Sequence, residues 1–102
     1  MDKMRIAVIG DGSEWTTLPV IRELKNDFKV IGFFNNKNNP IRHSTGLSYF
    51  TTILSPSNKF FHKYLLYKLY KLKIDILLCL NEEIKLHLVN NSNLYRYFKF
   101  AF

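Results

Sequence analysis

Two polar segments carry side chains that could do chemistry, and each directly follows a mainly apolar run. Gly10-Asp11-Gly12-Ser13 comes after residues 4–9, and Asn81-Glu82-Glu83 comes after residues 74–80. Short apolar runs that end in polar turns indicate buried parallel strands, and open α/β sheets bind ligands at the carboxyl ends of such strands. The residues that we predict to form a small-molecule site are Gly10, Asp11, Gly12, Ser13, Asn81, Glu82 and Glu83.

The glycine-rich turn offers backbone N–H groups and a following helix start, which together could hold an anion. Its Gly-x-Gly pattern is also how a dinucleotide fingerprint begins. However, Trp15 stands where the third glycine belongs, and Asn35 ends the second apolar run where an acidic residue is expected. These departures argue against NAD, and the chain has no P-loop sequence. A turn that needs glycine only to reach a positive φ is an equally weighted alternative.

The acidic segment also has two interpretations, which the sequence leaves open. Glu82 and Glu83 could bind a substrate amine at the carboxyl edge of the sheet. Equally, they could only complement the positive end of a helix dipole, with Asn81 as the N-cap.

Histidine and cysteine give no sign of a metal site or of a nucleophile. His43, His62 and His87 share no ligand-like spacing with each other or with Cys79. Cys79 lies within an apolar run without a cation beside it, as a buried structural thiol does. We therefore predict neither a metal site nor a catalytic residue in this chain.

Apolar periodicity predicts the elements that must position these segments. Strands are expected over residues 4–10, 28–34, 49–54, 74–80 and 97–102, with helices from Thr16 or Thr17 to about 26, over 58–72 with Ser57 as the cap, and from 82 onward. A short helical turn is expected over 41–46. This alternation predicts one α/β domain over residues 1–102: a Rossmann-like three-layer α/β/α fold with a mainly parallel sheet of four to five strands.

The formal net charge of +7 and a pI near 9.6 raise the question of an anionic partner. The helix over 58–72 alternates Lys and Tyr, which could stack on and neutralise single-stranded nucleic acid. A solvated face with partly buried tyrosines is the favoured interpretation, so we expect no nucleic-acid partner. The sequence has neither an apolar stretch of about 18 residues nor a secretion signal, so we expect a cytoplasmic protein without membrane contact.

The order of the segments resembles the pre-ATP-grasp domain that opens ATP-grasp ligases such as the large chain of carbamoyl phosphate synthase. The similar segments are IAVIGDGS, FKVIGFFNN, GLSYFTTILSPS and KIDILLCLNEE, and together with the helices between them they cover nearly the whole chain. Ser48-Tyr49, Ile74-Asp75 and Glu82-Glu83 match the family pattern. Phe50-Thr51 and Asn35-Asn36 depart from it, each where the family has an acidic residue.

This resemblance implies an enzyme that joins a carboxylate to an amine or thiol through an acyl phosphate. ATP and magnesium would be held by two downstream ATP-grasp lobes of the same protein, so this chain is expected to be the N-terminal part of a longer one. The chain itself would supply one wall of the cleft for a small-molecule carboxylate or amine, from Gly10 to Ser13 and from Asn81 to Glu83. The resemblance leaves a homodimer open.

Two alternatives remain beside the ligase. The first is a stand-alone Rossmann-like module that binds a ligand or partner without catalysis, because this architecture hosts many functions. The second is a formyltransferase-like domain, although the Asn, His and Asp catalytic set of that family is not recognisable here.

Overall fold

The fold is built on one sheet of five parallel strands in the order β3-β2-β1-β4-β5. The computed structural model describes residues 3–11, 15–35 and 40–101. The strands are β1 (Arg5–Gly10), β2 (Lys29–Phe34), β3 (Tyr49–Thr52), β4 (Ile76–Cys79) and β5 (Lys99–Phe100). The predicted α/β fold with a mainly parallel sheet is confirmed, and β5 is shorter than expected.

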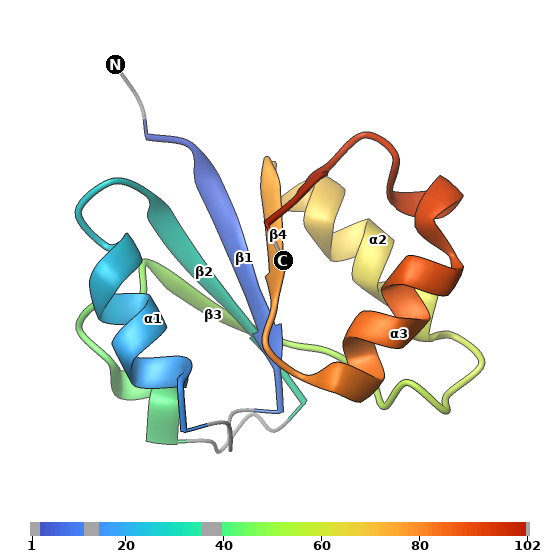
Figure 1. Ribbon diagram of the computed structural model, residues 1–102, viewed down its shortest axis with the longest axis horizontal. Helices are drawn as coiled ribbons and strands as arrows, with labels where there is room; N and C mark the ends of the chain where they lie inside the picture. The colour runs from blue at the N-terminus through green and yellow to red at the C-terminus, as the bar shows by residue number, and fades with distance from the viewer. Residues whose placement is uncertain (1–2, 12–14, 36–39, 102) are drawn as a thin grey trace.

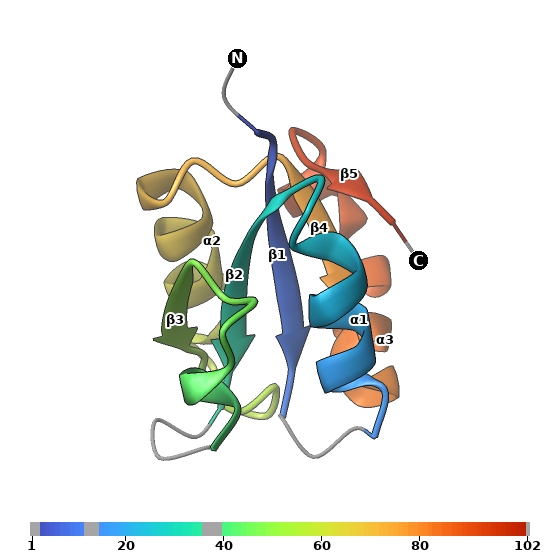
Figure 2. The ribbon, with the colours of Figure 1, turned by 90° about the vertical axis from the view of Figure 1, so that its left-hand side faces the viewer.

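Helices cover both faces of the sheet (Figure 1). α1 (Thr17–Leu24) packs on one face, while α2 (Phe61–Lys71) and α3 (Glu82–Asn90) pack on the other. Two 3₁₀ turns, η1 (Pro40–His43) and η2 (Ser92–Tyr95), complete the described elements. Figure 2, turned by 90°, shows α1 in front of the sheet with α2 and α3 behind it. This is the predicted three-layer α/β/α arrangement.

β1 shows why the sequences of the central strands are continuously apolar. Ala7 and Ile9 join the cluster under α2 and α3, whereas Ile6 and Val8 join the cluster under α1. Successive side chains of a strand point to opposite faces, so a strand that is covered on both sides is apolar at every position.

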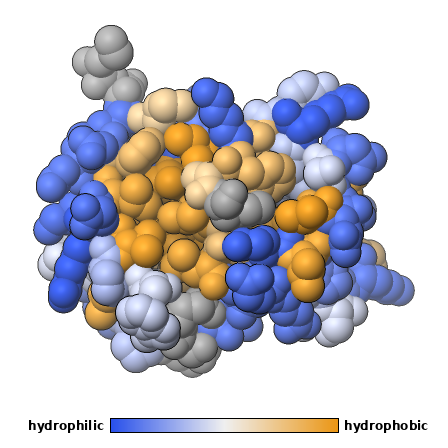
Figure 3. All heavy atoms as spheres, in the orientation of Figure 1, coloured by the Kyte–Doolittle hydropathy of each residue, from blue (hydrophilic) through white to orange (hydrophobic). Residues whose placement is uncertain are grey.

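The two apolar clusters differ in how completely they are covered. The cluster under α2 and α3 includes buried side chains from the helices and from η2, namely Phe61, Leu65, Leu69, Ile84, Leu88 and Tyr95. On the α1 side, β4 contributes Ile76 and Leu78 and the residue after it is Leu80, and all three are only partly buried. Figure 3 shows apolar surface over the strands beside α1.

α2 begins three residues later than the predicted start at residue 58. Asn58 forms a local turn in which its Oδ1 accepts from the Phe60 N–H at 2.8 Å and its carbonyl accepts from the Phe61 N–H at 3.0 Å. The N-cap residue of α2 is Phe60 and no side chain caps the helix, so the prediction that Ser57 is the cap is wrong; the hydroxyl of Ser57 lies 3.0 Å from that of Ser55 instead. Asn can bond its own following backbone in this way, which competes with helix formation.

α1 also differs in detail from its prediction. Thr16 is the N-cap residue, but its side chain makes no capping hydrogen bond. Thr17 and Ile21 are buried on the sheet side, while Leu18 is 39% exposed although it is apolar and lies three residues before Ile21. The hydroxyl of Thr17 is buried, and within the described residues it has no hydrogen-bond partner.

α2 ends in a left-handed residue that aims the chain into β4. Lys73 has a φ of 56°, its N–H donates to the Tyr70 carbonyl, and the Ile74 N–H donates to the Leu69 carbonyl. This pair of bonds is the Schellman motif, and Ile74 and Leu69 share an apolar cluster, as that motif favours.

No helix in the described ranges is long and apolar enough to span a membrane. α2 is the longest of them at 11 residues, whereas a span needs about 20.

Candidate functional site

The candidate site lies where the chain leaves two neighbouring strands for opposite faces of the sheet. β1 and β4 are hydrogen-bonded neighbours, and their chain continuations lead to α1 on one face and to α3 on the other (Figure 1). Open parallel sheets bind ligands at such a switch point, outside the carboxyl ends of the strands. Gly10, Asp11 and residues 81–83, which are the described part of the two predicted segments, flank this point.

Strand pairing brings Asp11 and Asn81 together although they lie 70 residues apart. Ile9 is opposite Cys79 in the parallel register, and the Leu80 N–H donates to the Ile9 carbonyl at 2.9 Å. Two residues beyond the Ile9/Cys79 pair in each segment, Asn81 Nδ2 donates to Asp11 Oδ2 at 3.4 Å. Asp11 and Asn81, both partly buried, therefore form the floor of the site.

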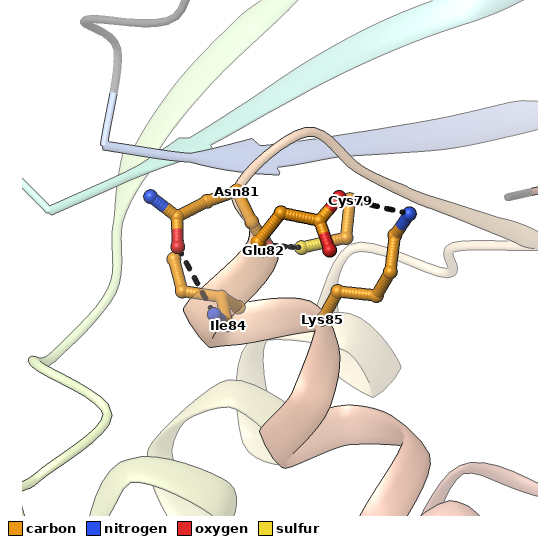
Figure 4. A network of polar contacts seen from close by, with 5 residues as sticks. All are labelled: Cys79, Asn81, Glu82, Ile84 and Lys85. Carbon is orange, nitrogen blue, oxygen red and sulfur yellow. Dashed lines mark hydrogen bonds and ion pairs between the residues drawn. The ribbon is translucent and has the colours of Figure 1, made fainter.

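Asn81 has a second task at this edge, which fixes its orientation. Its backbone is extended, with φ −101° and ψ 126°, and its Oδ1 accepts from the Ile84 N–H at 3.0 Å (Figure 4). The predicted N-cap of α3 is thus confirmed. The side chain caps the helix with its oxygen, and its amide nitrogen donates across the switch point to Asp11.

Cys79, the last residue of β4, lies next to Asn81 and has a structural contact there. Its side chain is buried, and its Sγ donates to the Asn81 carbonyl at 3.4 Å (Figure 4). The prediction that the Cys79 thiol is buried is confirmed.

Glu82 and Glu83 occupy the first turn of α3 and are both exposed. Glu82 Oε1 lies 3.5 Å from Lys85 Nζ in an i,i+3 ion pair (Figure 4). Exposed first-turn carboxylates favour the helix dipole and also raise the negative potential of the site. Both interpretations of this pair therefore stay open.

Gly10 is the last residue of β1, where it is buried and paired with Phe34. Gly12 and Ser13 lie outside the described residues, as does the predicted positive φ of Gly12. The described side chains that meet at the switch point are thus one carboxylate and one carboxamide. Such groups suit a ligand ammonium or hydroxyl group, which can donate hydrogen bonds to them.

A second polar cluster, formed by His62, His87 and Tyr95, was not predicted from the sequence. His62 Nδ1 lies 2.6 Å from the hydroxyl of Tyr95, and the rings of His62 and His87 are 6.4 Å apart. Burial lowers the pKa of His62, and the nearby charge of His87 lowers it further. Burial also raises the pKa of Tyr95 above its ordinary value. The contacts join α2, α3 and η2, so this cluster fixes the three elements to one another.

Within the described residues, no group of three or more His, Cys, Asp or Glu side chains could hold a metal ion. No protein-family profile matches the chain, and a comparison with curated proteins finds no match.

Proposed function

We propose that this chain is a small-molecule-binding α/β domain whose ligand lies at the β1/β4 switch point. We further propose that it supplies the substrate wall of an ATP-grasp carboxylate–amine (or thiol) ligase. The observation that carries the proposal is the contact of Asp11 with Asn81 across the carboxyl ends of two neighbouring strands. It places polar groups where parallel sheets bind ligands.

The ligase part rests on where the family-like segments fall in the fold. The glycine turn follows β1, and Glu82-Glu83 opens the helix after β4. Because β1 and β4 are neighbours, Asp11 and the start of α3 share one edge, as a single cleft wall requires. Asp11 would accept a hydrogen bond from the substrate amine, and the first-turn carboxylates of α3 would strengthen the attraction for its positive charge.

Mg-ATP does not fit the described residues of this chain. A magnesium site takes octahedral oxygen ligands and usually more than one carboxylate or phosphate, but the Asn81 oxygen is already used by Ile84. Within the described ranges, no candidate ligand group of three is present. In the proposed ligase, ATP and magnesium therefore belong to the downstream lobes, and this chain binds and orients the substrate.

The test is ADP release from Mg-ATP by the natural protein, with a panel of amines and carboxylic acids. We expect ADP to form only when an acid and an amine are both present. Asp11→Asn should raise KM for the amine, whereas Asp27→Asn, an exposed acid after α1, should not. If no acid–amine pair yields ADP, the ligase part is wrong. Amine binding that is unaffected by Asp11→Asn would contradict the site itself.

A module that binds a ligand without catalysis is the second candidate. It is favoured by the composition of the switch point, where the described side chains offer hydrogen-bond partners and Cys79 is buried as a structural donor. Amine binding at Asp11 without ADP formation would select this candidate over the ligase.

A further inference from the structure

The charges of this chain are strongly segregated along the sequence. Residues 28–74 contain no Asp or Glu, although they carry eight of the fifteen Lys and Arg residues. All eight acidic residues lie outside this segment. The segment includes β3 and α2, which lie at the same edge of the molecule (Figure 2). That edge is therefore a basic surface opposite in charge to the acidic segment of the switch point.

Two adjoining cavities run along this edge and share Tyr67. One, of about 170 Å³, is lined by Tyr49, Thr51, Tyr67, Lys68, Lys71 and Leu72. The other, of about 540 Å³, is lined by Leu54, Phe60, Lys63, Tyr64 and Tyr67. We call the two together the Tyr67 groove. It combines aromatic rings with lysines, and none of its lining residues is acidic.

Three of the four aromatic residues that line the Tyr67 groove are exposed to solvent, and the fourth, Tyr64, is partly buried. Tyr49 is 55% exposed, Phe60 is 52% exposed and Tyr67 is 61% exposed. Lysine ammonium groups lie beside two of these rings, with Lys59 5.1 Å from the centre of Phe60 and Lys71 5.6 Å from that of Tyr67. Exposed rings next to cations are the combination on which bases stack while their phosphates are neutralised.

Lys68 disfavours one alternative function of this edge, namely the binding of a peptide as an added strand. Its Nζ donates to Thr51 Oγ1 at 2.7 Å and to the Thr52 carbonyl at 2.9 Å. A lysine that covers an edge strand in this way opposes the addition of another strand. A peptide that extends the sheet from β3 is therefore disfavoured, whereas Lys59, Lys63 and Lys71 remain exposed for phosphates.

An anionic membrane is also a poorer fit. Phe61, Leu65 and Leu69, the apolar stripe of α2, are buried against the sheet. The helix therefore has no free apolar face to bury in a bilayer, as interfacial helices do.

We propose that the Tyr67 groove binds single-stranded nucleic acid. Bases stack on Phe60, Tyr67 and Tyr49, and Lys63 and Lys71 neutralise the neighbouring phosphates. This revises the expectation, drawn from periodicity, that the Lys and Tyr side chains of α2 only form a solvated face. The 11 residues of α2 span about 16 Å, so the groove accommodates a few nucleotides. We expect a Kd of about 10⁻⁴ to 10⁻⁶ M, with no preference in sequence beyond stacking strength.

The test is fluorescence anisotropy with a labelled oligothymidylate of about ten nucleotides. Tyr67→Ala should weaken binding by about five-fold or more, because stacking on one ring is lost. Tyr97→Ala is the matched control, since Tyr97 is 71% exposed and lies beside Arg96, with 5.0 Å from the guanidinium carbon to its ring centre. Equal effects of Tyr67→Ala and Tyr97→Ala would overturn the proposal.

The salt dependence gives a second, independent readout. Lys63→Gln and Lys71→Gln should each reduce the slope of log Kd against log salt by about 0.7, the value for one phosphate contact of a single strand. Lys99→Gln, on β5 at the opposite edge of the sheet, should leave the slope unchanged. Equal effects of the three substitutions would mean general charge attraction and would contradict a site in the groove.

Competition separates nucleic acid from other polyanions. Unlabelled oligothymidylate should displace the probe, whereas polyglutamate and anionic vesicles at equal charge should displace it far less. Equal displacement by polyglutamate or by vesicles would contradict the stacking that defines the proposal. Asp11→Asn, a substitution at the switch point, should leave oligonucleotide binding unchanged. A failure of the nucleic-acid proposal can therefore be distinguished from a failure of the proposed ligase function.

Discussion

The two faces of the sheet bury the same strands to different extents. On β4, Leu77 and Cys79 point under α2 and α3 and are 0% and 3% exposed, whereas Ile76 and Leu78 point to the α1 side and are only partly buried. Two helices and η2 cover the first face, whereas α1 and η1, the latter through Ile41, cover the second. Because more side chains are buried under α2 and α3, that face contributes more of the hydrophobic stabilisation.

The helices of the two faces also differ in how their ends are fixed. α3 has a side-chain cap from Asn81 and α2 ends in a Schellman motif, while α1 has no capping side-chain bond at Thr16. The better-fixed face holds Asn81, which also reaches the switch point. We infer that the site depends on the α2/α3 face for its geometry and depends less on the α1 face.

The largest expected effect on stability is a difference between two adjacent leucines whose side chains lie on opposite faces of the sheet. Leu77→Ala should lower the free energy of unfolding by about 2 to 5 kcal/mol, because it leaves a cavity in a closed core. Leu78→Ala should cost less than half as much, since its side chain is already partly exposed. Urea denaturation of both variants measures the difference. Equal losses would show that the two faces are equally closed.

The next largest effect on stability is a difference between the N-caps of α3 and α1. Asn81→Ala should cost about 0.5 to 2 kcal/mol, because the Ile84 N–H loses its acceptor. Thr16→Ala should cost little, since no capping bond is lost. Thermal unfolding of both variants tests this, and a larger loss at Thr16 would reverse the comparison.

A smaller effect, of opposite sign, is expected at the end of α2. Lys73 holds a φ of 56°, which glycine adopts without the steric cost that a side chain incurs. Lys73→Gly should therefore stabilise the protein by up to about 1 kcal/mol, as measured by urea denaturation. Lys25→Gly, at the right-handed C-cap of α1, should destabilise it. A loss of stability at position 73 would contradict the role assigned to the left-handed turn.

The smallest expected effect is a dependence of stability on pH at the His62 cluster. The pKa of His62 is lowered in the folded protein, so the unfolded chain binds the proton first as the pH falls. The contribution of His62 to stability is fully present above its ordinary pKa of 6.5. That contribution is lost as the pH falls from 6.5 through the lowered pKa of the folded protein. Melting temperatures measured downward from about pH 7.5 should show this decline, and His62→Gln should flatten it. An unchanged profile in His62→Gln would contradict this assignment.

Much of the fold could be predicted because the spacing of apolar residues in the sequence indicates which side chains are buried. Phe61, Leu65 and Leu69 lie at four-residue spacings on one face of α2, and all three are buried. The start of α2 could not be predicted, because the local turn of Asn58 competes with the helix through a single side-chain bond. Likewise, apolar spacing alone did not indicate that Leu18 is exposed, although it lies three residues before the buried Ile21.

The sequence predicted that both segments belong to one site, but it could not predict which of their side chains meet. That Asp11 contacts Asn81 depends on β1 and β4 being neighbours, and the sequence does not state the order of the strands. The cluster of His62, His87 and Tyr95 is hidden for the same reason, since its members come from three elements that meet only after packing. The Tyr67 groove has a signal in the sequence, namely the absence of acidic residues from 28 to 74.

The most direct test of the switch-point site is an amide NMR titration of this chain with a panel of primary amines and amino acids. We expect chemical-shift changes concentrated at Asp11 and at residues 81–83 in the presence of a binding amine. Asn81→Asp keeps a helix cap but places a second carboxylate beside Asp11, so it should change the affinity without unfolding α3. Asp27→Asn should bind like the unaltered chain. Shift changes that avoid the carboxyl ends of β1 and β4, or an affinity that neither Asp11→Asn nor Asn81→Asp alters, would contradict a ligand site at the switch point.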